Sequence, residues 1–166
     1  MKYLIWLFAL AIAVPAHAQK SKPHKPTTVL LTNKQTTTPA NAPVLVVKRT
    51  PCHGTCPTYT ATIFADGRVE YEGERFVTLT GKHTLSLPVA TVTQMLAEAK
   101  RVNFSKFDDK YGGNASGLPA TIITVQPVGQ PAKTVRAQQD IPPSLEAYIN
   151  FLTQRLDPLA NGVADK

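Results

Sequence analysis

The chain has 166 residues, with 18 lysines and arginines against 11 aspartates and glutamates, and two cysteines. This length fits one domain with its own hydrophobic core, so a disulfide is not needed as the main stabiliser. The basic excess is scattered, and the chain shows neither a basic stripe with interleaved aromatic residues nor a nucleic-acid reader motif. Those absences exclude the usual patterns of nucleic-acid binding.

Residues 1–18 have the order of parts typical of a signal peptide. Lys2 gives a positive start, Tyr3 to Val14 form an apolar run, Pro15 ends it, and Ala16-His17-Ala18 is a small-x-small cleavage site. The run is shorter than the ~20 apolar residues that a transmembrane helix needs. The sequence therefore predicts cleavage after Ala18 and a periplasmic or secreted protein without a transmembrane anchor.

The segment that follows, residues 19–42, is rich in Lys, Pro, Thr, Gln and Asn. It predicts a flexible leader, because such a composition cannot bury enough apolar surface to order itself. After cleavage 17 basic residues stand against 11 acidic ones, a net charge of +6. That charge suits contact with an anionic polymer or another anionic surface of the cell envelope. A basic surface with no dedicated partner is the alternative.

Residues 43–157 predict a single α+β domain that opens with strands. Continuous or alternating apolar residues favour strands, and Asp66-Gly67 is typical of a tight hairpin turn. The strand patterns fall at Val44–Val47, Thr58–Ile63, Val69–Gly73, Phe76–Val77 and His83–Leu87.

The second half of the domain predicts a helix, two strands and a final helix. Pro88 suits a first-turn position, and apolar residues recur at helical spacing from Val89 to Val102. Strands are expected at Thr121–Val125 and Ala132–Arg136. A final helix is expected with the apolar stripe Leu145, Ile149, Leu152 and Leu156. It should end at Asp157-Pro158, and residues 158–166 should form a frayed tail. The order ββββ-α-ββ-α predicts an antiparallel sheet of about six strands with two helices packed on one face.

The cysteine pair is the main candidate site. Cys52 and Cys56 are separated by three residues in a turn between two strands, and in an oxidising compartment such a pair favours a structural disulfide. Thiol–disulfide exchange is one alternative, although redox pairs usually stand at a helix N-terminus. A zinc module is the other, with Cys52, His53 and Cys56 as ligands and His83 as a fourth.

No complete catalytic motif accompanies this turn, so catalytic and cofactor-binding residues are predicted to be absent and enzymatic activity is uncertain. The spacing of His53 and His83 relative to Asp66, Asp108 and Asp109 does not favour an acid–base set. The glycine-rich loop from Tyr111 to Pro119 is either a binding loop or a plain connector. Core or edge positions are expected for the aromatic residues Tyr71, Phe76, Tyr111 and Tyr148.

Two motifs carry a resemblance to a known family. The first is Thr50-Pro51-Cys52-His53-Gly54-Thr55-Cys56-Pro57-Thr58-Tyr59, and the second is Asp66-Gly67-Arg68-Val69-Glu70-Tyr71-Glu72-Gly73. With Leu118 to Ile122 and the final helix, they make the chain from about 44 to 157 resemble an uncharacterised family of exported bacterial proteins, the domain of unknown function 6438. The resemblance implies the domain boundary and export, and it assigns no activity.

These observations lead to one expectation with two alternatives. We expect an exported binding or interaction module of the cell envelope, with Cys52 and Cys56 joined as a staple and no cofactor or metal. The alternatives are a thiol–disulfide redox protein that uses the same cysteines and a zinc-binding module that uses Cys52, His53 and Cys56.

Overall fold

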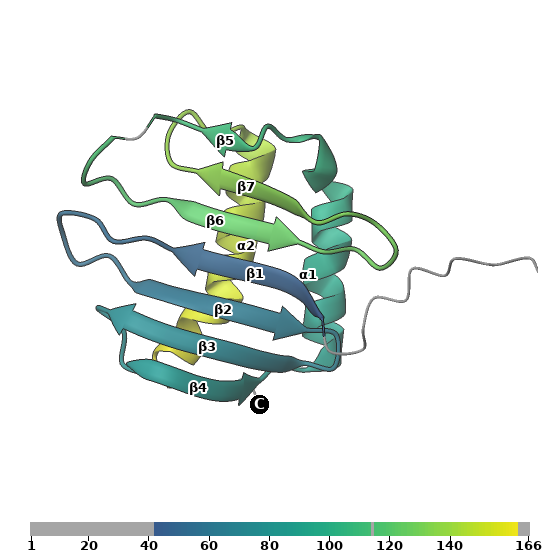
Figure 1. Ribbon diagram of the computed structural model, residues 1–166, viewed down its shortest axis with the longest axis horizontal. Coiled ribbons are helices and arrows are strands. Elements are labelled where there is room, and N and C mark those ends of the chain that lie inside the picture. Colours follow the sequence, from purple (N-terminus) through teal and green to yellow (C-terminus); the bar gives the residue numbers. More distant parts are fainter. Residues whose placement is uncertain (1–41, 114, 163–166) are drawn as a thin grey trace, which may run out of the picture. The chain divides into compact units, whose positions relative to one another are not determined.

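The computed structural model describes residues 42–113 and 115–162. The predicted signal peptide and almost all of the predicted leader lie outside these residues. Within the described part, seven strands form one sheet in the order β4-β3-β2-β1-β6-β7-β5, and two helices cover one of its faces (Figure 1). The predicted α+β class, with a mainly antiparallel sheet and helices on one face, is confirmed.

The first four strands succeed one another through short connections: β1 (Pro43–Arg49), β2 (Thr58–Phe64), β3 (Arg68–Arg75) and β4 (Gly81–Ser86). The helix α1 (Val89–Arg101) and the single 3-10 turn η1 (Phe104–Lys106) follow. The chain then forms β5 (Lys110–Tyr111), β6 (Thr121–Val125), β7 (Lys133–Ala137) and α2 (Pro143–Ala160). Neighbouring strands are antiparallel except β5 and β7, which are parallel.

The hydrophobic core lies between the sheet and the two helices. Residues that alternate along the strands face the helices in register, so that Val47 lies between Ala61 of β2 and Ile123 of β6. The helices bury apolar stripes against them, made of Val92, Met95 and Ala99 on α1 and Leu145, Tyr148, Leu152 and Leu156 on α2. The opposite face is rich in threonine and charge, as expected for an antiparallel sheet with one wet side.

The structure corrects the expected secondary structure at two places in the first half. Phe76–Val77 is not a strand. It belongs to the β3–β4 connection, where Phe76 has a φ of 55° that no strand allows. Val89 was expected in the apolar stripe of the first helix, but it is 53% exposed, whereas Val92 in the same turn is buried.

Two corrections concern the second half. The two-residue strand β5 was not expected, since Lys110-Tyr111 has no periodicity of its own and is held by hydrogen bonds to β7. The final helix does not end at Asp157-Pro158 but runs through Pro158 to Ala160. Burial of Leu159 and Ala160 outweighs the one backbone donor that the proline lacks.

One glycine fixes how the β3–β4 connection packs. A Cβ atom on Gly73 would lie 1.9 Å from the carbonyl oxygen of Leu79 and 3.0 Å from the ring of Tyr71. The backbone of the connection therefore crosses β3 so closely that only a glycine fits at this position.

We expect Gly73→Ala to lower the free energy of unfolding by about 2–3 kcal/mol, as overpacking against backbone does. Urea unfolding monitored by circular dichroism would measure it. Gly113→Ala is the matched control, since its Cβ would meet nothing closer than 3.9 Å. Equal stability of the two variants would contradict the close crossing.

Candidate functional site: the loop end of the sheet

Three connections lie at the same end of the sheet, on the left in Figure 1. They are residues 50–57 between β1 and β2, residues 76–80 between β3 and β4, and the connection from β5 to β6, of which we use residues 115–120. We call this region the loop end. It contains the cysteine motif that the sequence singled out.

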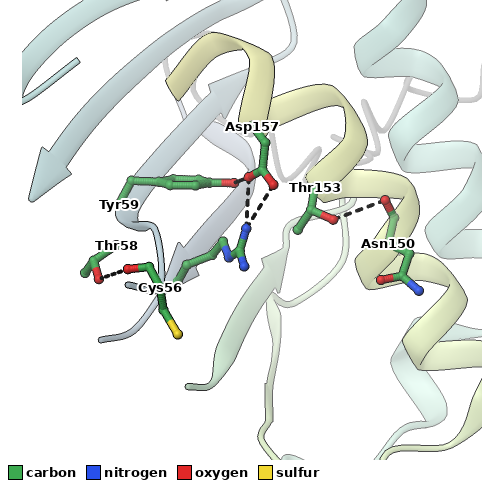
Figure 2. A network of polar contacts seen from close by, with 7 residues as sticks. Cys56, Thr58, Tyr59, Asn150, Thr153 and Asp157 are labelled. Carbon is green, nitrogen blue, oxygen red and sulfur yellow. Dashed lines mark hydrogen bonds and ion pairs between the residues drawn. The ribbon is translucent and has the colours of Figure 1, made fainter. Parts of the chain in front are cut away.

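The first connection is closed by a disulfide. Cys52 and Cys56 are bonded, with their Cα atoms 5.8 Å apart, as predicted. The backbone N–H of Gly54 donates a hydrogen bond to Cys52 Sγ, and the hydroxyl of Thr58 donates to the carbonyl of Cys56 (Figure 2). The tip from His53 to Thr55 is exposed. The staple thus shapes a tight turn and leaves its tip in solvent.

The disulfide turn docks against the β5–β6 connection. Thr50 N–H donates to Ala120 O at 2.9 Å, Ala120 N–H donates to the Thr50 hydroxyl at 2.7 Å, and His53 N–H donates to Gly117 O at 3.1 Å. A Cβ on Gly117 would lie 1.6 Å from the His53 ring, and the φ of Gly117 is +84°. Both facts require glycine there. The two connections therefore form one surface.

Two side chains support this surface: Arg136 of β7 and Gln138, which follows the last residue of β7. Gln138 donates to the carbonyls of Ala115 and Leu118 at 3.1 and 3.0 Å. Arg136 donates to Gln138 Oε1 at 3.0 Å. The carbonyls of an irregular segment are thereby satisfied by side chains. The Leu118 side chain stays 41% exposed, so the supported loop presents an apolar group to solvent.

A polar cluster lies directly beneath the disulfide turn. Arg49 ends β1, Tyr59 lies opposite it on β2, and Asp157 lies near the end of α2. Arg49 Nη1 donates to both carboxylate oxygens of Asp157 at 3.0 Å, and the Tyr59 hydroxyl donates to Oδ1 at 2.8 Å (Figure 2). Both carboxylate oxygens of Asp157 thus accept hydrogen bonds from donors on two neighbouring strands.

The electrostatics argue against a base or nucleophile at Tyr59 or at Tyr71, whose ring centroid lies 5.5 Å from that of Tyr59. Burial raises the pKa of Tyr59 far above its ordinary value, and the charge and hydrogen bond of Asp157 raise it further. Burial, with a smaller contribution from Asp157, raises the pKa of Tyr71 to about 12. Both phenols therefore keep their protons at physiological pH, and neither provides a base or a nucleophile.

The other residues considered for acid–base chemistry are not brought together. His53 lies at the loop end, whereas Asp66 lies in the β2–β3 turn at the opposite end and accepts a hydrogen bond from Arg68 N. His83 is bonded through its ring to Thr80 O, and Asp109 pairs with Lys133. No three His, Cys, Asp or Glu side chains within residues 42–113 and 115–162 are placed to hold a metal ion.

The structure adds Phe76, a residue that the sequence pattern placed in the core or at a sheet edge. Its side chain is 50% exposed, and its backbone φ of 55° lies in the left-handed region. For a bulky residue this conformation is a genuine outlier. The Arg75 guanidinium lies 5.4 Å from the ring centroid. The strand-like pair Phe76-Val77 hid this feature, and only the backbone angle reveals it.

The two tyrosines differ in one testable respect, because the Tyr71 hydroxyl has no hydrogen-bond partner among the described residues. We expect Tyr59→Phe to lower the free energy of unfolding by about 1–3 kcal/mol, since Asp157 loses a donor. Tyr71→Phe should be neutral or stabilising, because it removes an unpaired buried hydroxyl. Thermal and urea unfolding would compare them. Equal losses would contradict the assignment of the cluster.

The same residues set a pH dependence. The pKa of Tyr71 is about 12 in the folded chain against an ordinary 10.0, so the unfolded chain loses this proton first. The stability that this difference in pKa contributes is complete below pH 10 and is lost as the pH rises toward 12. We expect Tyr71→Phe to flatten that decline by up to about 1.4 kcal/mol per pH unit. Urea titrations at several alkaline pH values would measure the slope, and an unchanged slope would contradict it.

The disulfide makes a bounded contribution to stability. Joint replacement of Cys52 and Cys56 by serine should lower the free energy of unfolding by about 2 kcal/mol or less, because so short a loop removes little entropy from the unfolded chain. Unfolding of oxidised protein, reduced protein and the double variant would test this. A loss far above that limit would show that the bond stabilises more than its own turn.

Comparison with known proteins gives one result. The family model described as Domain of unknown function (DUF6438) matches residues 43–156, a span that begins with β1 and ends within α2. The curated proteins and the solved structures gave no match. Within the described residues no helix has the length and apolar character that crossing a membrane demands. The chain belongs to the DUF6438 family of domains of unknown function.

Proposed function

We propose that this chain is an exported module of the cell envelope that binds a protein partner through its loop end. Phe76 is the observation that carries the proposal. Holding a bulky residue in the left-handed region costs about 1–2 kcal/mol. Since the ring is half exposed, packing within the domain does not explain why this cost is retained. An aromatic anchor for a partner does, because such anchors dominate protein interfaces.

The rest of the loop end supports binding over chemistry. Its connections are held in place by the disulfide, by hydrogen bonds between the loops and by Gln138. Preorganised loops on a rigid scaffold are a common way to build a binding surface. Exposed apolar side chains at Phe76 and Leu118 provide contact area, whereas Tyr59 beneath them keeps its proton and the Asp157 carboxylate is paired with Arg49.

Export is supported by two features of different kinds. The first 18 residues have the charge, apolar run and cleavage site of a signal peptide. The only two cysteines of the chain form a disulfide, a bond that persists mainly outside the cytoplasm. In a reducing compartment, thiols would reach this partly exposed disulfide and reduce it. We therefore place the module in the periplasm or outside the cell.

Site-specific photo-crosslinking in the native cell envelope tests the proposal. A photoreactive phenylalanine analogue at position 76 should give a discrete adduct with one protein. The same analogue at Val128, which is 77% exposed between β6 and β7 at the other end of the sheet, should not. Adducts of equal yield at both positions, or none at either, would refute binding through the loop end. Adducts with polysaccharide alone would replace the protein partner by a polymer.

Stability and binding should change in opposite directions at Phe76. We expect Phe76→Gly to raise the free energy of unfolding by about 1 kcal/mol, because glycine adopts positive φ without strain. It should also abolish the adduct formed by a photoreactive residue at position 118. Asn103→Gly is the control: its φ is 54°, but asparagine tolerates that region, so little should change. A destabilised Phe76→Gly variant would show that the ring packs on its own domain.

A further inference from the structure

The strand β4 is an open edge of the sheet. It is six residues long and is bonded only to β3 within the described part of the chain (Figure 1). The register between β3 and β4 is regular, without a bulge. Natural proteins usually blunt such edges with short strands, charged side chains (lysine above all), prolines, bulges or a covering element. The other edge follows that rule, since β5 has two residues, but β4 carries one charge and no proline.

The direction of the free backbone groups follows from the register. Leu87 N–H donates to Gly67 O, which makes 87 and 67 a hydrogen-bonded pair, and such pairs recur at every second residue of an antiparallel ladder. Leu85, His83 and Gly81 therefore bond to β3. The N–H and C=O groups of Lys82, Thr84 and Ser86 point away from the sheet, where a further strand would meet them.

A groove lies beside this edge on the helix-covered side. Its volume is about 550 Å³, and its apolar wall is made of Leu79, Leu85 and Leu159, with Thr84 and Ser86 at the rim. These leucines come from the β3–β4 connection, from β4 itself and from the end of α2. Side chains on one face of an added strand would enter this groove, because alternate residues point to the same side.

We infer that β4 is a strand-addition site for an extended segment of another protein. Backbone groups of the segment would pair with Lys82, Thr84 and Ser86, and its alternate apolar side chains would fill the groove, which is the usual mode of β-augmentation. Lys82, the one charged residue of β4, is exposed and already lies opposite Glu72 of β3, so the uncovered face calls for polar side chains on the segment and requires no particular charge.

A second copy of this chain fits the same edge less well. In an antiparallel β4–β4 pair, the residues turned toward the groove would be Gly81, His83 and Leu85 of the other copy, which supply one apolar side chain. The inference goes beyond the proposed function: the groove shares Leu79 of the β3–β4 connection with the loop end, but strand addition on β4 requires neither export nor binding through Phe76.

A synthetic peptide tests the inference on the folded chain from residue 19 onward. The probe is an acetylated, amidated heptapeptide that alternates glutamate or threonine with valine or leucine. In a heteronuclear NMR titration it should shift the amide signals of Lys82, Thr84 and Ser86, and those amides should gain protection from hydrogen exchange. A shuffled peptide of equal composition is the control. No binding, or shifts confined to other strands, would overturn the inference.

Two modifications separate backbone pairing from simple apolar contact. Thr84→Pro removes an outward N–H and leaves the bonds to β3, so it should weaken the peptide at least about tenfold, whereas Thr84→Val should not. If Thr84→Pro fails to fold, N-methylation of alternate peptide residues gives the same test on the native chain. Unchanged affinity for the methylated peptide would refute strand pairing. Concentration-dependent protection of β4 without peptide would make a second copy the occupant.

Discussion

The contact of Asp157 with Arg49 and Tyr59 joins the parts of this domain that matter most for its proposed function. It connects the end of α2 to the two central strands, with distances of 2.8 to 3.0 Å from the carboxylate to its donors. Arg49 and Tyr59 also lie on either side of the disulfide turn. Both stems of that turn are therefore fixed by one carboxylate, while Cys52–Cys56 closes the tip. Because the pair is only partly exposed, it is screened less than a surface ion pair.

This arrangement holds the stems of the disulfide turn in a fixed geometry. Tyr59 and the neighbouring Tyr71 stay protonated, and the Asp157 carboxylate accepts hydrogen bonds from two donors. The core and this cluster supply stability that permits less favourable features elsewhere. These are the left-handed backbone of Phe76 and the β4 edge, which has neither a bulge nor a proline. Departures of this kind from local rules concentrate at functional sites in natural proteins. Both features lie on or beside the β3–β4 connection. This hairpin therefore exposes groups that the stability of the fold does not require.

Most of the fold could be predicted because its elements are strongly periodic. Alternation in Thr58–Phe64 and the helical stripe from Val92 to Ala99 are local signals that tertiary packing did not override. The failures have identifiable causes. Phe76-Val77 looks like a strand because residue type says nothing of a positive φ. Pro158 looks like a helix end because the burial of Leu159 and Ala160 is not visible in the sequence. The strand β5 exists only through its partner β7.

The sequence by itself determined the α+β class, the family motifs and the cysteine turn, because each depends on local spacing or composition. Only the tertiary structure decided the functional geometry. It brought Asp157 to Arg49 and Tyr59 across about 100 residues of chain, docked Gly117 on His53, left β4 as an edge and exposed Phe76. These features depend on which distant segments become neighbours, and long-range pairing of that kind leaves no periodic trace in the residues involved.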